Sequence, residues 1–191
     1  MSEILTGAGW FLIPLGLCSL AAIFISIERL LALRTQNIVP SGWMDQVTGN
    51  ALDFEPASTS SVMGRLIAYY QSQQPDSEAL KSFARLETVR LERGLFVLEV
   101  VVGAAPLLGL LGTVTGLIQV FSGIDPGTGL PDPAIFVEGI AMALGTTALG
   151  LIIAIPAMAM HALLYRRVDL HAVRVAVAVE QLMNHSQHDK G

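Results

Sequence analysis

The sequence has few of the residues that keep a globular protein soluble. Only 14% of its 191 residues are charged, whereas soluble domains average roughly 25%. Apolar residues make up 52% and the mean hydropathy is +0.59, so the composition also excludes a disordered chain. These proportions predict a membrane protein.

Other scarce features disfavour several classes of function. The single cysteine, Cys18, excludes an internal disulfide, and no Cys/His cluster has the spacing of a metal site. The formal net charge is −5, whereas nucleic-acid recognition requires a basic patch. We therefore expect no cofactor, no metal and no nucleic-acid partner.

Three long stretches contain no Asp, Glu, Lys or Arg. They are Ile4–Ile27 with 24 residues, Val100–Ile124 with 25 and Gly139–Tyr165 with 27. A helix needs about 20 apolar residues to cross a bilayer, and a helix satisfies its own backbone in lipid. The sequence predicts an all-α membrane protein with three transmembrane helices. A signal peptide is the alternative for the first stretch, but its basic residues follow the apolar run instead of preceding it.

The basic residues predict the orientation. All 11 Lys and Arg residues lie just after the first stretch, in the segment before the second, or after the third. Since basic residues favour the cytoplasmic side, we expect the N-terminus outside and the C-terminus in the cytoplasm. The predicted parts are a tail with helix 1 (1–34), a cytoplasmic segment (35–95), helix 2 (96–121), an outer turn (122–138), helix 3 (139–165) and a cytoplasmic tail (166–191).

Helical periodicity continues outside the predicted spans. Apolar residues recur at three-to-four spacing from Leu80 to Leu95, with Ser77 as a candidate N-cap, and again from Val168 to Leu182. We expect helices 2 and 3 to extend into a cytoplasmic helical bundle, helix 2 as one rod because no proline interrupts it. Residues 35–75 are expected to form short helices and loops.

Small residues recur in the second and third stretches at a spacing that lets helix backbones approach closely. The candidate helix-packing residues are Ala105, Pro106, Gly109, Gly112, Gly116, Ala141, Gly145, Gly150 and Pro156.

Threonines lie well inside the same two stretches. Their hydroxyls either bond back to their own helix or face a hydrated lumen, where Thr113 and Thr147 are the leading candidates. Both Glu99 and Glu138 lie at span ends, so no carboxylate is available at mid-membrane. Because an ion pathway needs a titrating group, another polypeptide would have to supply it.

The second stretch reads APLLGLLGTVTG over 105–116, and the third reads GIAMALGTTALGLIIAIPA over 139–157. Together with Glu28-Arg-Leu and Glu92-Arg-Gly-Leu, these segments resemble the MotA/TolQ/ExbB proton-channel family. The similarity runs from about residue 82 to 170. The three predicted spans and short outer turn resemble ExbB or TolQ more than the flagellar stator subunit.

The resemblance implies a pentamer in the bacterial inner membrane, with the N-terminus and the 122–138 turn in the periplasm. The pentamer would enclose transmembrane helices of a small, single-span ExbD/TolR-like partner, whose aspartate is protonated and released. The resemblance also implies that ion flow energises a TonB-like protein, and that Thr113 and Thr147 line the lumen. Three further residues, Thr146, Glu138 and Met142, are candidates for the ion pathway. Many ExbB and TolQ chains have a glutamate where this chain has Met142.

Three other functions remain as alternatives. A TolQ-type subunit would serve envelope maintenance, and a passive scaffold would only hold its partner. An intramembrane enzyme is disfavoured because Ser19 and Ser26 lack a nucleophile motif and His161 is isolated. We expect no enzymatic activity.

Overall fold

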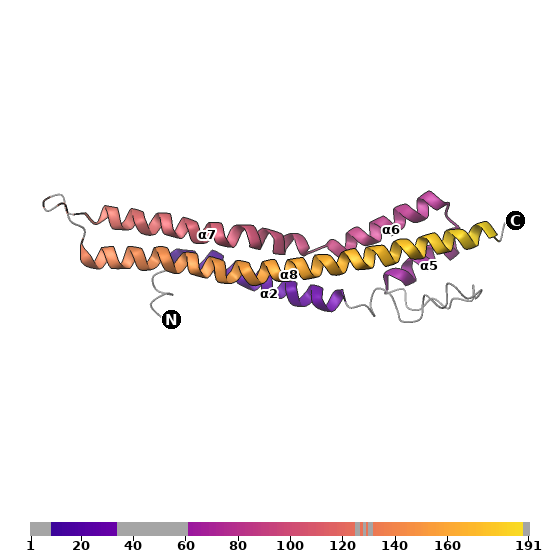
Figure 1. The fold of residues 1–191 in the computed structure, drawn as a ribbon, viewed down its shortest axis with the longest axis horizontal. Coiled ribbons are helices and arrows are strands. Elements are labelled where there is room, and N and C mark those ends of the chain that lie inside the picture. Colours follow the sequence, from indigo (N-terminus) through magenta and orange to yellow (C-terminus); the bar gives the residue numbers. More distant parts are fainter. Residues whose placement is uncertain (1–8, 34–60, 125–126, 128, 130–131, 189–191) are drawn as a thin grey trace. The chain divides into compact units, whose positions relative to one another are not determined.

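The computed structural model describes residues 9–33, 61–124, 127, 129 and 132–188 (Figure 1). Within these ranges the chain forms no strand; it forms a 3-10 helix, η1 (Gly9–Phe11), and the helices α2 (Leu12–Ala32), α5 (Val62–Gln73), α6 (Ser77–Glu92), α7 (Leu95–Ser122) and α8 (Pro133–His188). Three segments are long and apolar enough to cross a membrane: α2, α7 and Pro133–Asn184 of α8. The predicted all-α membrane fold with three spans is confirmed.

The helices group into two compact units. The first contains residues 1–27 and 94–162, and the second contains residues 28–93 and 163–191. Both α2 and α8 contribute to each unit. Residues 1–8 of the predicted tail lie outside the described residues, as do residues 34–60, which include most of the short helices and loops predicted over 35–75.

In the first unit, α7 and the beginning of α8 form an antiparallel hairpin (Figure 1). The backbone N–H of Asp132 donates to the carbonyl of Gly123 at 3.1 Å, which closes the turn. The Asp132 side chain accepts from Ala134 N–H at 2.8 Å, and Pro133 occupies the first helical position, where its missing N–H costs nothing. The Asp132 side chain and Pro133 therefore determine where α8 begins.

Most of α2 lies on the surface of the chain. Among its 21 residues only Leu15 and Ala22 are buried, while large apolar side chains such as Leu17, Leu20 and Phe24 are more than 60% exposed. A single chain leaves this helix uncovered, as expected for a helix that contacts lipid or a neighbouring subunit.

In the second unit, α5 and α6 pack with the later part of α8. Each short helix has a side-chain cap: Ser61 accepts from Gly64 N–H at 2.9 Å, and Asp76 accepts from Ala79 N–H at 2.8 Å. Asp76, and not the predicted Ser77, is therefore the N-cap of α6. Large apolar side chains that are fully buried in this unit include Met63, Leu66, Leu80, Leu164, Val168 and Val175.

The predicted continuous rod in helix 2 is wrong. Helix α6 ends at Glu92 and α7 begins at Leu95. Gly94 between them has a φ of 90°, in the left-handed region that glycine adopts without steric cost. One glycine thus breaks the helix although no proline is present.

Helix 3 extends as predicted. α8 continues as one helix of 56 residues past Arg167, although it contains Pro156. Because proline lacks an N–H, the carbonyl of Ile152 loses its usual partner there, yet the helix is not interrupted.

Candidate functional site

Small residues form the contact between α7 and α8 in the first unit. On α7 the buried stripe includes Ala105, Gly109, Gly112 and Gly116. On α8 the facing residues are Gly139, Ala143, Thr146 and Gly150, all buried. We call these eight residues the α7–α8 contact.

The two backbones approach so closely that side chains are excluded at several positions. A Cβ added at Gly112 would lie 2.1 Å from Thr146 Oγ1, and one at Gly116 would lie 2.4 Å from the carbonyl oxygen of Gly139. At Gly150 the distance to the carbonyl oxygen of Ala105 would be 2.5 Å. These glycines are required by the contact, which matches the close approach that holds helices together in lipid.

The other predicted packing residues lie elsewhere. Gly145 is buried and Pro106 is half-buried, whereas Ala141 and Pro156 are exposed in the single chain. Ala141 therefore takes no part in the α7–α8 contact, where Gly139 and Ala143 occupy the equivalent positions. Sequence reasoning missed these two residues, although their four-residue spacing carried the same signal.

The carbonyl of Gly109 is a polar centre within this contact. Thr147 Oγ1 donates to it across the helix pair at 3.1 Å. In an α-helix the same carbonyl is the acceptor for the amide of residue 113. The Thr147 hydroxyl and the backbone amide of Thr113 therefore meet at one backbone group, because no side chain on Gly109 stands between the helices. The Thr146 hydroxyl also lies 3.4 Å from this carbonyl.

Thr146 has a different environment. It is 0% exposed, and its hydroxyl donates to the carbonyl of Met142, one turn earlier in its own helix, at 2.8 Å. Its side chain fills the space that the missing side chain of Gly112 leaves. Within one chain, Thr146 is a packing residue without access to water.

The Thr113 hydroxyl donates to the carbonyl of Leu110 at 2.6 Å. The side chain is half-buried. Because a hydroxyl has one proton and two lone pairs, Thr113 can still accept hydrogen bonds. The back-bonded arrangement and a lumen-facing role are thus compatible for this residue.

Helix geometry places Thr113 and Thr147 on one side of the pair. Each follows a residue of the contact, Gly112 or Thr146, by one position, or about 100° of rotation. In two right-handed helices that run antiparallel, this rotation turns both side chains toward the same side. We call this side the threonine flank. The two residues differ in height by about 3 Å, from a rise of 1.5 Å per residue.

The two remaining candidates lie on the other side of the contact. Met142 precedes Thr147 by five residues, so the two point about 140° apart around α8. Glu138, one turn before Met142, is exposed, whereas Met142 is half-buried. On α7, Thr115 lies on this same side and its hydroxyl is 3.0 Å from both the Leu111 and Gly112 carbonyls. We call this side the methionine flank.

The chemistry of the threonine flank is limited to neutral hydroxyls. Such groups can coordinate a cation or pass a proton, but they cannot store charge at neutral pH. The sequence has no Asp, Glu, Lys or Arg in 100–124 or 139–165. Within the part of the chain that the structure describes, no group of three His, Cys, Asp or Glu could hold a metal ion.

Comparison with known proteins gives a consistent set of similarities. Residues 56–176 match the MotA/TolQ/ExbB proton channel family. The chain is 30% identical over 187 residues to the "Biopolymer transport protein exbB1" of Vibrio cholerae, covering 90% of this chain and 80% of that protein.

Two further relatives carry similar names. The "Putative biopolymer transport protein ExbB-like 1" of Synechocystis is 33% identical over 184 residues, covering 83% of this chain and 67% of that protein. The "Biopolymer transport protein ExbB" of Aquifex aeolicus is 38% identical over 100 residues, covering 52% of this chain and 66% of that protein.

Proposed function

Because the chain belongs to the MotA/TolQ/ExbB proton channel family, we propose that it is an ExbB-like motor subunit whose ion pathway follows the threonine flank. Several copies, five by the family resemblance, would surround transmembrane helices of a small, single-span ExbD/TolR-like partner. The partner would supply the aspartate that binds and releases each ion. The complex would use the proton motive force to energise a TonB-like protein for transport across the outer membrane, without enzymatic activity of its own.

The observation that carries this proposal is the hydrogen bond from the Thr147 hydroxyl to the Gly109 carbonyl, which is also the helical acceptor of the Thr113 amide. Thr147 is anchored there at 3.1 Å, and the helix register turns Thr113 to the same side. Each hydroxyl donates its proton to a backbone carbonyl, so its lone pairs accept hydrogen bonds from water or from a protonated carboxyl group at nearly one height. Because the spans hold no carboxylate of their own, these neutral groups need a charged partner to conduct.

The proposed orientation follows from the basic residues. With a periplasmic N-terminus, the α7–α8 turn lies in the periplasm, and the second unit lies in the cytoplasm. Arg166 and Arg167 would mark the cytoplasmic end of the third span. One elementary charge crossing 100 mV releases about 2.3 kcal/mol, which is the driving force available per ion.

Ion flux in liposomes tests the proposal. The chain is reconstituted with its ExbD/TolR-like partner, and proton entry is followed with an enclosed pH-sensitive dye under an imposed potential. Replacing Thr147 or Thr113 with valine, which has nearly the same shape, should lower the flux at least about tenfold, equivalent to roughly 1.4 kcal/mol of added barrier.

Thr115→Val is the matched control, because it removes a hydroxyl from α7, the helix that carries Thr113, but on the methionine flank. The control should conduct like the wild type, and all three variants should assemble with the partner in detergent. An intact Thr147→Val complex with unchanged flux would contradict the proposal and favour a passive scaffold. Rescue of a strain defective in Tol–Pal function, without rescue of TonB-dependent uptake, would favour the TolQ-type role.

A further inference from the structure

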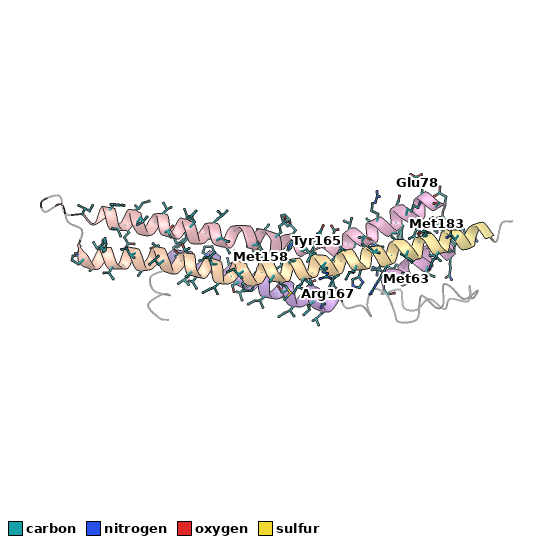
Figure 2. All side chains as sticks on the ribbon, viewed as in Figure 1. Met63, Glu78, Met158, Tyr165, Arg167 and Met183 are labelled. Carbon is teal, nitrogen blue, oxygen red and sulfur yellow. The ribbon has the colours of Figure 1, made fainter. Side chains whose placement is uncertain are left out.

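A cavity in the second unit has a composition that the proposed ion pathway does not explain. It has a volume of about 630 Å³ and lies between the last residues of the α2 segment, Leu30, Leu31 and Leu33, and one face of α8. From α8 it is lined by Arg167, Leu170, His171 and Arg174. Figure 2 marks Arg167 on α8 beside the last turns of α2.

His171 is the buried polar group of this cavity. Its side chain is 4% exposed, and its Nε2 lies 3.3 Å from the carbonyl oxygen of Leu33. Since a carbonyl only accepts, Nε2 carries a proton and donates it. The other ring nitrogen, Nδ1, is buried and has no hydrogen-bond partner among the described residues. A buried polar atom without a partner is costly.

The protonation state of this ring defines what Nδ1 can bind. Burial lowers the pKa of His171 from its ordinary value of 6.5, and Arg174 and Arg167 lower the pKa further, whereas the hydrogen bond to the Leu33 carbonyl raises it. The imidazole is therefore neutral at pH 7, and Nδ1 offers a lone pair to a hydroxyl or amine donor.

The two arginines supply the complementary charge. Both are exposed on α8, and neither forms an ion pair or hydrogen bond with the described part of the chain. Guanidinium groups bind phosphate oxygens through paired, charge-assisted hydrogen bonds. Leu30, Leu31 and Leu170, each at least 40% exposed, add an apolar wall beside them.

In the topology of the proposed function, on which this step rests, the cavity lies where a span meets water on the cytoplasmic side. Leu30 and Leu31 belong to the last turn of the apolar helix α2, and Arg167 follows the uncharged stretch 139–165 of α8. Basic cavities between transmembrane helices on the cytoplasmic side are suited to phospholipid headgroups.

We propose that this cavity binds the headgroup of an anionic phospholipid, with the phosphate on Arg167 and Arg174 and a headgroup hydroxyl on His171 Nδ1. The leucines contact the first carbons of the acyl chains. Bound there, the lipid joins the end of α2 to α8 within the second unit. Phosphatidylglycerol has both required groups, a singly charged phosphate and free hydroxyls.

Native mass spectrometry of the delipidated, assembled protein tests the proposal by titration with phosphatidylglycerol or with phosphatidylcholine of the same acyl chains. Phosphatidylglycerol should bind at least about tenfold more tightly, since only it leaves a net negative charge for the arginines. The variant R167Q/R174Q should lose this preference. Arg166→Gln is the matched control, because Arg166 is exposed on the same turn but does not line the cavity, and it should bind like the wild type.

Three outcomes would overturn the proposal. One is equal binding of the two lipids by the wild type, and another is an unchanged preference in R167Q/R174Q. The third is displacement of phosphatidylglycerol by millimolar inorganic phosphate, which would identify a site for a free anion. Helix content by circular dichroism and complex size confirm that each variant is folded, so every result decides for or against the lipid.

Discussion

Helix α8 packs in two different ways along its length. In the first unit its contact residues are Gly139, Ala143, Thr146 and Gly150, which face glycine and alanine on α7. In the second unit most of its buried positions hold larger apolar residues such as Leu164 and Val168, although Ala178 is also buried. The spacing of three and four residues is common to both, but the size of the residues changes.

The difference follows from the solvent. In lipid, apolar side chains gain nothing from contact with one another, so helices associate by close backbone approach and interhelical hydrogen bonds. In water, each buried leucine contributes about 2 kcal/mol of hydrophobic free energy. The change from small to large residues therefore indicates where α8 leaves the bilayer.

The largest effect is expected from a variant that disrupts the α7–α8 contact between small residues. Gly112→Leu puts a side chain where a Cβ alone would lie 2.1 Å from Thr146 Oγ1. We expect a cost of at least about 3 kcal/mol and loss of the assembled complex, measured by size-exclusion chromatography in detergent. Gly103→Leu is the control, because nothing lies within 4 Å of its added Cβ. A normal complex with Gly112→Leu would refute the account of this contact.

A second variant disrupts the packing of large apolar side chains in the second unit. Leu66 on α5 is 0% exposed in the second unit. Leu66→Ala should lower the free energy of unfolding of that unit by about 2–5 kcal/mol, seen as faster proteolysis within residues 61–93. The first unit should be unaffected, since Leu66 is not part of it. Leu86→Ala, an exposed leucine on α6, should change proteolysis little.

A third variant tests the charged part of the second unit. Glu87 on α6 is 0% exposed and pairs with Arg65 on α5, whose Nε donates at 3.0 Å, and with Arg90 one turn later. Glu87→Gln should destabilise the unit by about 1–3 kcal/mol, because two arginines lose their carboxylate. The exposed Glu78→Gln is the control (Figure 2). Equal chemical denaturation midpoints for both variants would contradict a structural role for this ion pair.

The smallest expected effect is the pH dependence from His171. Its pKa is lowered by burial below 6.5, so the unfolded chain binds the proton more readily than the folded chain. Stability of the second unit should therefore be full above about pH 6.5 and decrease as the pH falls below it. In His171→Gln the thermal unfolding midpoint should depend less on pH over this range than in the wild type. Identical slopes for the two proteins would show that His171 is not buried in this way.

Some of this architecture was predictable because it is encoded locally. The absence of charge over 24 to 27 residues predicts the spans, and α8 extends through the predicted apolar periodicity. The break at Gly94 was not predicted, because a single glycine within an apolar periodicity is compatible with a helix until its φ of 90° is known.

The register of the α7–α8 contact shows more clearly what the sequence alone does not predict. Residues 139, 141, 143 and 145 are all glycine or alanine, so the sequence offers two overlapping pairs at four-residue spacing. Only packing against α7 selects Gly139 and Ala143 and leaves Ala141 exposed. Similarly, the hydrogen bond between His171 and Leu33 joins residues 138 positions apart in the sequence. No local pattern predicts a contact at that separation.

The central proposal, a hydrated threonine flank, is tested most directly by thiol modification in the assembled complex. In a Cys18→Ala background, Thr113→Cys, Thr147→Cys, Thr115→Cys and Met142→Cys are each exposed to a charged, water-soluble thiol reagent, which reacts with thiolates in contact with water. The account predicts modification at positions 113 and 147 and protection at 115 and 142. Modification confined to positions 115 and 142 would contradict it.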